Sequence, residues 1–208
     1  MKDEKKSVVV ALTGGIGTGK SSVANILRKK GVVSISTDLI AKTVMKENLD
    51  VINEIKSFFG DDIYLADGNV DKVRLAKAVF GASEQNKLAL DKLNQIVHPR
   101  VIEKMIELVE QYEKAGEKII VVESALIFEA GLEDGFDFII TVFTDEEKVI
   151  ERIKERFGLS TEEAFARIKS QMSQKEKAEL SDFVIENNAG FDDLIKAVEF
   201  VYSVLINL

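Results

Sequence analysis

Short apolar runs alternate along the chain with longer stretches of helical periodicity. The uninterrupted run Val8–Leu12 is typical of a strand that is buried on both faces of a parallel sheet. It precedes a glycine-rich turn and a predicted helix over Ser21–Lys30, with Gly31 at the position of a left-handed helix stop. A second strand is predicted over Val32–Ile35. This order of strand, loop, helix and strand indicates an α/β fold with right-handed crossovers.

The segment from about residue 41 to residue 115 is almost wholly helical in its pattern. Apolar residues recur there at three- and four-residue spacing, as at Leu93 and Val97. Pro99 is the only proline of the chain, and a proline disfavours helical dihedral angles in the residue before it. We therefore expect one helix to end near His98 and another to begin after it.

Strand signals return in the second half of the chain. Apolar runs predict strands over Lys118–Val122, Phe136–Phe143 and Asp182–Glu186. Ser160–Glu163 reads STEE, the pattern of a capping box that opens a helix, and a last helix is expected from about Phe191. The pattern as a whole predicts a parallel α/β core that is interrupted by a helical insertion and by a charged helical segment.

Composition excludes several classes of protein. The chain of 208 residues has 28 Lys and Arg against 36 Asp and Glu, a formal net charge of −8, which argues against general nucleic-acid binding. Without cysteine and with a single histidine, it cannot form disulfides or a site of clustered Cys or His ligands. No apolar run reaches the roughly 18 residues of a membrane span. The first seven residues lack a secretory apolar region, so we expect a cytoplasmic protein.

A phosphate-binding motif lies between the first predicted strand and helix. Gly14–Ser21 reads GGIGTGKS and satisfies G-x-x-x-x-G-K-[ST]. Its glycines allow backbone N–H groups to point at phosphate oxygens, and the helix N-terminus adds positive partial charge. We expect Lys20 to reach the β- and γ-phosphates and the Ser21 hydroxyl to coordinate Mg²⁺. The ATP contacts predicted here are Gly15, Ile16, Gly17, Thr18, Gly19, Lys20, Ser21 and Ser22.

A phosphate loop alone does not choose among kinases, molecular switches and motor ATPases. The sequence has no obvious N-K-x-D motif for reading guanine. The helical insertion soon after the second strand would supply a pocket for a second substrate. These two features favour a small-molecule kinase.

Asp38 follows the second predicted strand within three residues, at the sheet edge where parallel sheets bind ligands. Its carboxylate could orient or deprotonate a substrate hydroxyl for attack on the γ-phosphorus. It could also contact Mg²⁺. The structural alternative is an N-cap for a helix that begins at Leu39.

Ordered blocks along nearly the whole chain resemble the dephospho-CoA kinase family. In these blocks Asp38 falls on the family's functional aspartate and His98 on its H-P pair, while Ser36, Glu123 and Ala125 depart from the family pattern. The blocks are Ala11–Ser22, Ser36–Ala41, Leu93–Val101 (LNQIVHPRV), Val121–Gly131 (VVESALIFEAG), Glu151–Met172 and Ser181–Asn187.

The resemblance implies transfer of the ATP γ-phosphate to the ribose 3′-hydroxyl of dephospho-CoA, with Mg²⁺ as cofactor. It implies a P-loop NTPase fold with a three-layer α/β/α core, a helical substrate-binding insertion and a helical lid. The implied core comprises residues 1–40, 116–144 and 181–208, the CoA-substrate domain residues 41–115, and the lid residues 145–180. No nucleic acid, membrane or obligate protein partner is expected.

Three of the six arginines lie within sixteen residues, at positions 152, 156 and 167. Arg152 and Arg156 share a helical face, where like charges repel unless an anion joins them. Neighbouring glutamates offer the alternative of a solvated, neutralised face. The resemblance favours a lid in which Arg152 and Arg156 stabilise the transferring phosphoryl group and Arg152 also contacts ATP. It implies that Arg167 contacts dephospho-CoA.

The remaining candidates carry open alternatives. His98 is either a packed or helix-terminal residue or, by the resemblance, a contact to dephospho-CoA. Glu123 either holds a water on Mg²⁺ or is simply an acid at a strand end. Glu129 could pair with a basic substrate-side group or a helix, Phe128 is interpreted as a core residue, and Asn187 is assigned to ATP.

Overall fold

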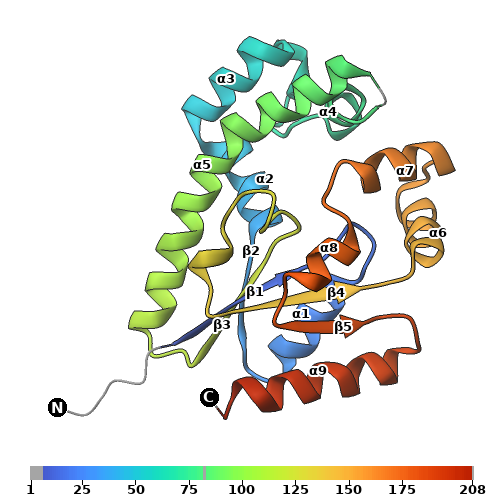
Figure 1. The fold of residues 1–208 in the computed structure, drawn as a ribbon. Coiled ribbons are helices and arrows are strands. Elements are labelled where there is room, and N and C mark those ends of the chain that lie inside the picture. Colours follow the sequence, from blue (N-terminus) through green and yellow to red (C-terminus); the bar gives the residue numbers. More distant parts are fainter. Residues whose placement is uncertain (1–6, 82, 208) are drawn as a thin grey trace. The chain divides into compact units, whose positions relative to one another are not determined.

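The computed structural model describes residues 7–81 and 83–207 (Figure 1). In that part of the chain five strands form one sheet in the order β2-β3-β1-β4-β5, and every adjacent pair is parallel. The predicted parallel α/β fold is therefore confirmed. The strands are β1 (Val8–Thr13), β2 (Val33–Ser36), β3 (Ile119–Glu123), β4 (Phe138–Phe143) and β5 (Phe183–Glu186).

The helices connect and flank these strands. They are α1 (Lys20–Lys29), α2 (Thr37–Glu47), α3 (Leu49–Phe59), α4 (Lys72–Val79), α5 (Glu84–Lys114), α6 (Glu146–Phe157), α7 (Thr161–Lys169), α8 (Gln174–Glu179) and α9 (Phe191–Leu205), with 3₁₀ turns at Asp61–Ile63 and Glu133–Gly135. None of the helices in the described ranges is both long enough and apolar enough to cross a membrane.

The chain divides into two compact units. One contains the described residues up to Ser36 together with those from Glu107 onward, and the other is Thr37–Ile106. The sheet and the phosphate loop belong to the first unit, whereas α2, α3, α4 and most of α5 belong to the second. The finer division into a substrate domain at 41–115 and a lid at 145–180 stays a prediction.

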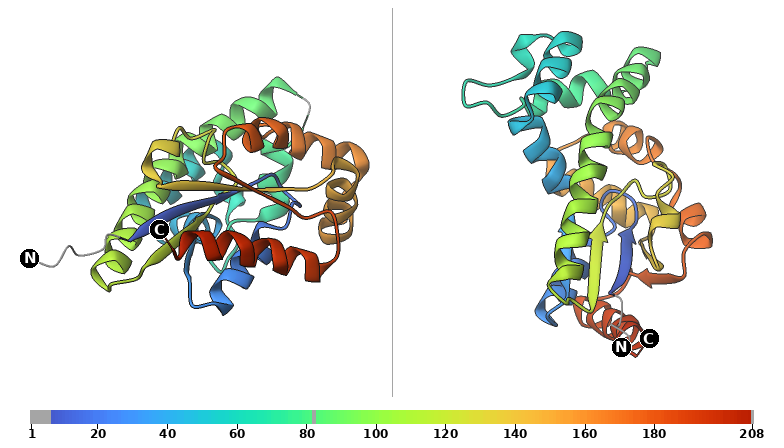
Figure 2. Two further views of the ribbon diagram at one scale, coloured as in Figure 1. Left: turned by 60° about the horizontal axis from the view of Figure 1, so that its bottom comes forward. Right: turned by 90° about the vertical axis from the view of Figure 1, so that its left-hand side faces the viewer.

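Side chains on both faces of the sheet explain the continuous apolar run in the first strand. Val10 and Leu12 are fully buried in a core that includes residues of α1 and α9. Ala11, between them, packs with Ile127 and Ile139, because successive side chains of a strand point to opposite faces. Figure 2 shows α1 and α9 together on one side of the sheet, in agreement with their direct contacts.

Local capping signals set several helix boundaries. The predicted capping box at Ser160 is present: its hydroxyl accepts from the Glu163 N–H, and the Glu163 carboxylate accepts from the Ser160 N–H. Asn48 and Asp71 likewise accept backbone N–H groups at the starts of α3 and α4. The last helix begins at Phe191 as expected.

The predicted helix break at Pro99 is wrong. Helix α5 runs without interruption from Glu84 to Lys114 and contains Pro99 in its interior. Buried residues Val97, Val101 and Met105 continue one apolar stripe at four-residue spacing through the proline. Burial of this stripe outweighs the local preference against a helical residue before proline.

The alternative of an N-cap role for Asp38 does not hold. Helix α2 begins at Thr37, so Asp38 is its second residue instead of the residue that precedes Leu39. β2 ends at Ser36 and passes directly into the helix without a connecting loop. The carboxylate is exposed and lies in the first helical turn, where negative charge interacts favourably with the helix dipole.

Candidate active site

The phosphate-loop motif lies between β1 and α1, in the context that the sequence predicted. Gly14, Gly17 and Gly19 have φ angles of 136°, 80° and 96°, a region that side chains disfavour. A Cβ atom at Gly14 would overlap the Val142 carbonyl oxygen, and one at Gly19 would overlap the Asn187 amide nitrogen. The glycines thus allow both the curl of the loop and the close approach of its neighbours.

Lys20 is the first residue of α1, and its amino group is directed back to the loop. The Nζ atom donates to the carbonyl oxygens of Gly14 and Gly15, at 2.8 and 3.0 Å. The Thr18 hydroxyl donates to the same Gly15 oxygen at 2.9 Å. These bonds hold the loop curled around a positive charge, so a ligand with phosphate groups would meet an ammonium group at this position.

Ser21 and Glu123 supply two adjacent oxygen groups beside the loop. Ser21 Oγ donates to Glu123 Oε1 at 2.6 Å, and Glu123 is the last residue of β3, only 7% exposed. A hydroxyl and a carboxylate are the hard oxygen ligands that Mg²⁺ prefers. No group of three or more acidic or histidine side chains suited to a metal ion occurs within residues 7–81 and 83–207. A site of this kind suits an ion that binds through one or two protein oxygens plus phosphates.

Arg152 reaches the phosphate loop from helix α6. Its guanidinium lies 3.4 Å from the Gly17 carbonyl oxygen and donates to the Asn187 carbonyl oxygen at 3.0 Å. The Asn187 side chain in turn donates to the Thr18 carbonyl oxygen at 2.8 Å, and Thr144 Oγ1 donates to that oxygen at 3.0 Å. The fold therefore brings two predicted ATP contacts, Arg152 and Asn187, onto the loop from distant parts of the sequence.

The other two arginines of the predicted lid have different surroundings. The guanidinium groups of Arg156 and Arg167 each lie 5.3 Å from the centre of the Phe157 ring, within the range of a cation–π contact. The hydrogen bonds from this group of arginines to the loop, as far as the structure describes them, come from Arg152. The catalytic role of Arg156 and the substrate contact of Arg167 stay predictions.

Asp38 and His98 belong to the second unit of the chain. His98 lies inside α5 and is half-buried, and burial lowers the pKa of its imidazole, which favours the neutral form. The roles of both residues toward a bound acceptor stay predictions.

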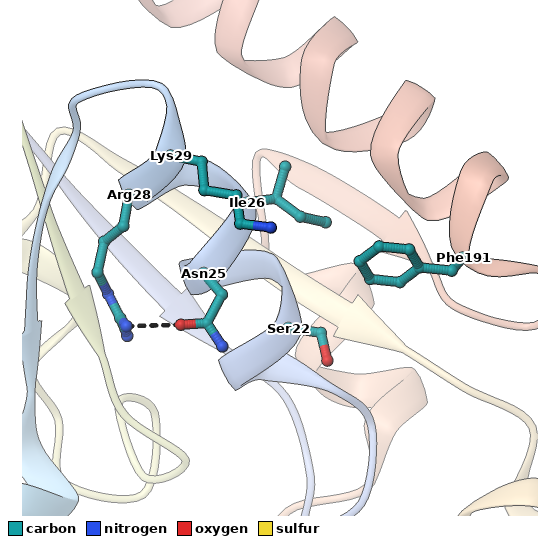
Figure 3. Close-up of a pocket in the computed structure, with 6 residues that line it drawn as sticks. All are labelled: Ser22, Asn25, Ile26, Arg28, Lys29 and Phe191. Carbon is teal, nitrogen blue, oxygen red and sulfur yellow. Dashed lines mark hydrogen bonds between the residues drawn. The ribbon is translucent and has the colours of Figure 1, made fainter.

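An open hollow of about 460 Å³ lies beside α1 and includes Phe191 at the start of α9 (Figure 3). It includes Ser22 of the predicted ATP contacts but none of Gly15–Ser21. The Arg28 guanidinium at its edge bonds the Asn25 side chain at 2.6 Å. Arg28 also lies 3.8 Å from Glu123, whose other oxygen accepts from Ser21, so the hollow adjoins the polar groups beside the loop. Its lining residues are Ser22, Asn25, Ile26, Arg28, Lys29 and Phe191.

The chain is similar to known proteins over most of its length. The family model described as "Dephospho-CoA kinase" matches residues 8–193, which include the whole sheet and all the candidate site residues. The chain belongs to the dephospho-CoA kinase family.

Curated dephospho-CoA kinases match over nearly their full length. The one from Listeria innocua is 40% identical over 189 residues, which cover 91% of this chain and 92% of the relative. The one from Fusobacterium nucleatum is 41% identical over 192 residues, covering 92% and 95%.

Two solved structures have a similar fold. A dephospho-CoA kinase from Campylobacter jejuni superposes with a TM-score of 0.67 at 30% identity, covering 94% of this chain and 95% of that one. A shikimate kinase from Bacteroides thetaiotaomicron has a TM-score of 0.55 at 11% identity, covering 96% and 98%. The second comparison shows only that the fold is similar to that of a shikimate kinase.

Two glutamines beside the loop of this dephospho-CoA kinase family member were not predicted from the sequence. Gln171 Oε1 accepts from the Ile16 N–H at 3.0 Å, and Gln174 Oε1 accepts from the Thr144 N–H at 2.9 Å. Gln171 lies in the Q-M pair of the block Glu151–Met172. That pair signalled the segment but not its partners, because a glutamine side chain has no preferred ligand that spacing could reveal.

The two remaining candidates are accounted for by contacts within the protein. Phe128 packs against the cluster of Ala11, Ile127 and Ile139, which confirms the core interpretation. Glu129 forms an ion pair with Lys177 of helix α8 at 2.9 Å, the helix-side alternative for this carboxylate.

Proposed function

We propose that this protein transfers the γ-phosphoryl group of ATP to the ribose 3′-hydroxyl of dephospho-CoA and so produces CoA and ADP. The observation that carries the proposal is the convergence of Lys20, Arg152 and Asn187 on the phosphate loop of a chain from this family. The same proposal includes a cytoplasmic location and no obligate protein partner.

The phosphate groups of ATP would be bound by the loop. Its backbone N–H groups and the start of α1 supply positive partial charge, and Lys20 supplies a full charge. Arg152 would offset the charge that spreads over the transferring phosphoryl group. Asn187 donates to the Thr18 carbonyl oxygen, so it would hold the loop in shape while ATP is bound.

Ser21 and Glu123 are the residues that would hold Mg²⁺, since they place a hydroxyl and a carboxylate 2.6 Å apart beside the loop. When bound, this ion would neutralise charge on the β- and γ-phosphates. Glu123 also lies near a cation, with Arg28 Nη2 3.8 Å from its second oxygen.

Acceptor binding is assigned to the helical part of the chain. Asp38 would accept a hydrogen bond from the 3′-hydroxyl and direct it at the γ-phosphorus. His98, half-buried and largely neutral, would contact the acceptor by a hydrogen bond and not by charge. Arg156 and Arg167 would approach as part of a lid, Arg156 toward the phosphates and Arg167 toward the acceptor.

A coupled ADP-release assay tests the proposal. With ATP and Mg²⁺, dephospho-CoA should be turned over faster than AMP, adenosine or shikimate by orders of magnitude in kcat/KM, and the product should be CoA. Asp38→Asn should lower kcat by roughly 100-fold or more, as expected for loss of a group that acts on the attacking hydroxyl. Equal turnover of all four acceptors would overturn the acceptor assignment, and wild-type kcat in Asp38→Asn would overturn the role of that carboxylate.

A further inference from the structure

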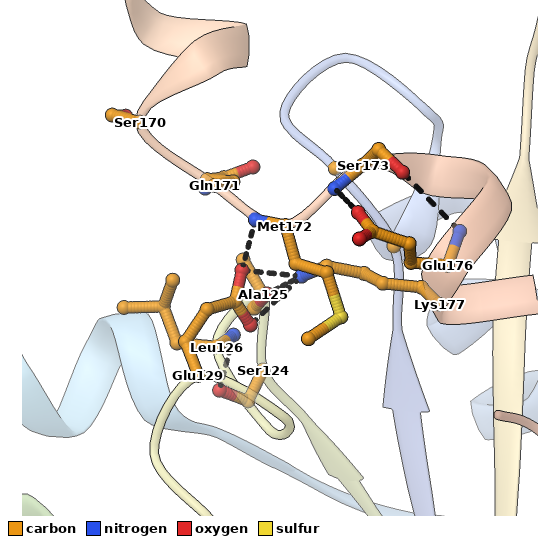
Figure 4. A network of polar contacts seen from close by, with 12 residues as sticks. Ser124, Ala125, Leu126, Glu129, Ser170, Gln171, Met172, Ser173, Glu176 and Lys177 are labelled. Atoms are coloured by element: carbon orange, nitrogen blue, oxygen red, sulfur yellow. Dashed lines mark hydrogen bonds and ion pairs between the residues drawn. The ribbon is translucent and has the colours of Figure 1, made fainter.

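Lys177 has a side chain that is fully buried, with 0% exposure. A buried ammonium group is costly unless it is paired and hydrogen-bonded. Its Nζ atom bonds the Ala125 carbonyl oxygen and lies 2.9 and 3.0 Å from the two oxygens of Glu129 (Figure 4). Burial lowers the pKa of Lys177, and the nearby Glu129 carboxylate opposes that shift. The lysine thus holds the segment that follows β3.

Glu129 also holds the connection between α7 and α8. Its Oε1 atom accepts from the Met172 N–H at 2.8 Å. In Figure 4 this carboxylate lies between the backbone of Met172 and the Lys177 amino group. Ser173, the next residue, forms a capping box with Glu176 at the start of α8. Glu129 belongs to the segment after β3. Its carboxylate therefore links that segment to Met172, which lies just before α8, and to Lys177 within α8.

Two glutamines on this stretch bond the loop region: Gln171 lies in the connection that Glu129 holds, and Gln174 is the first residue of α8. Gln171 accepts directly from the Ile16 N–H of the phosphate loop. Gln174 accepts from the Thr144 N–H, and the Thr144 hydroxyl donates to the Thr18 carbonyl oxygen. A continuous series of contacts therefore leads from Lys177 to both halves of the phosphate loop.

We propose that Lys177 is a positioning residue for phosphoryl transfer: its ion pair with Glu129 holds residues 171–174 so that Gln171 fixes the backbone of the phosphate loop. An apolar side chain of similar length would fill the same volume, but it would leave the Glu129 carboxylate without its cation, and removing one partner of a buried pair is destabilising. Such a side chain would not hold the Ala125 oxygen or Glu129. The charge of Lys177 therefore helps to fix the position of the phosphate loop. This inference rests on the proposed function.

The test is a double-variant cycle on kcat with Lys177→Met and Gln171→Leu. Each single variant should lower kcat at saturating ATP and dephospho-CoA by roughly 10-fold, because small misplacements of reacting groups carry costs of this order. If Lys177 acts through Gln171, the double variant should be no slower than the slower single variant. The KM for dephospho-CoA should stay within about twofold of wild type, since neither side chain is assigned to the acceptor.

Lys175→Met is the matched control, because Lys175 is an exposed lysine on the same helix. It should leave kcat unchanged alone and should not alter the effect of Gln171→Leu. All assays are run well below the lowest thermal midpoint of the set. If Lys177→Met does not fold, Glu129→Gln replaces it in the cycle, since it removes the ion pair while it keeps the shape of the carboxylate.

Multiplicative effects in the cycle, or wild-type kcat in Lys177→Met, would overturn the positioning role. Failure of the proposed function has a different signature: the wild-type protein would then not phosphorylate dephospho-CoA. In that case the same cycle is measured on ATP affinity by titration calorimetry. Non-additive losses there would support the coupling of Lys177 to the loop, and additive ones would overturn it.

Discussion

Single residues of the site owe their position to contacts that sequence spacing does not report. Arg152 and Arg156 are four apart on α6, yet only Arg152 has described hydrogen bonds to the loop, while Arg156 lies beside Phe157. The glycines of the loop are more predictable. Their positive φ angles follow from the motif itself, although the overlap at Gly19 depends on Asn187, which comes from the far end of the sheet.

Gly19→Ala tests this difference, with Gly31→Ala as the matched control. Gly19 and Gly31 flank α1 and both have positive φ, but a Cβ at Gly31 would meet no atom within 4 Å. We expect Gly31→Ala to cost about 1–2 kcal/mol of stability from backbone strain alone and to leave kcat unchanged. Gly19→Ala should cost more and should also raise the KM for ATP, because it displaces Asn187 from the loop.

The measurements are the denaturant midpoint and the steady-state kinetics of each variant. Equal losses of stability in the two variants, with normal ATP kinetics in Gly19→Ala, would show that the contact with Asn187 does not matter.

Elements were predicted well where one physical signal decides them and poorly where two compete. The strands follow from apolar runs and α7 from its capping box, and both are confirmed. In α5 the proline signal competes with the apolar stripe of Val97, Val101 and Met105, and the stripe determines the structure. The local rule concerns one residue, whereas the stripe is buried along several turns.

Pro99→Ala should therefore stabilise α5. A proline in a helix interior costs about 3 kcal/mol relative to alanine in model systems. We expect a gain of about 1–3 kcal/mol in the free energy of unfolding, measured by urea denaturation followed by far-UV circular dichroism. Arg100→Ala, at the adjacent exposed position, is the control and should not stabilise. A loss of stability in Pro99→Ala would mean that the proline ring itself supports the packing of the helix.

At the scale of the whole molecule, the net charge of −8 does not prevent a site for anionic ligands. Positive groups gather locally: Lys20 lies against its own loop, Arg152 reaches the loop from α6, and the start of α1 adds its dipole. Local geometry outweighs a net charge that is spread over the surface and screened beyond about 10 Å at 0.1 M salt.

Binding of ATP with Mg²⁺ should therefore raise the thermal midpoint of the protein. At a free ligand concentration of 100 Kd the linkage is about 2.7 kcal/mol, or roughly 5–10 °C for a chain of this size. Differential scanning fluorimetry measures the shift, and a chelator should reduce it. Lys20→Ala should lose most of it, whereas Lys29→Ala, an exposed lysine on the same helix, should keep it. An equal shift in Lys20→Ala would contradict binding at the loop.

The sequence by itself determined the parallel α/β fold, the phosphate loop with Lys20 and Ser21, the capping box and the family. Each of these depends on residues that are close in the chain, on apolar periodicity, or on motifs in a set order. Only the tertiary structure decided that Gln171 and Gln174 lie on the loop region, that Lys177 pairs with Glu129, and that α5 continues through Pro99. These features join residues from different elements, and their partners are chosen by packing and by the need to satisfy buried polar groups, which no local pattern records.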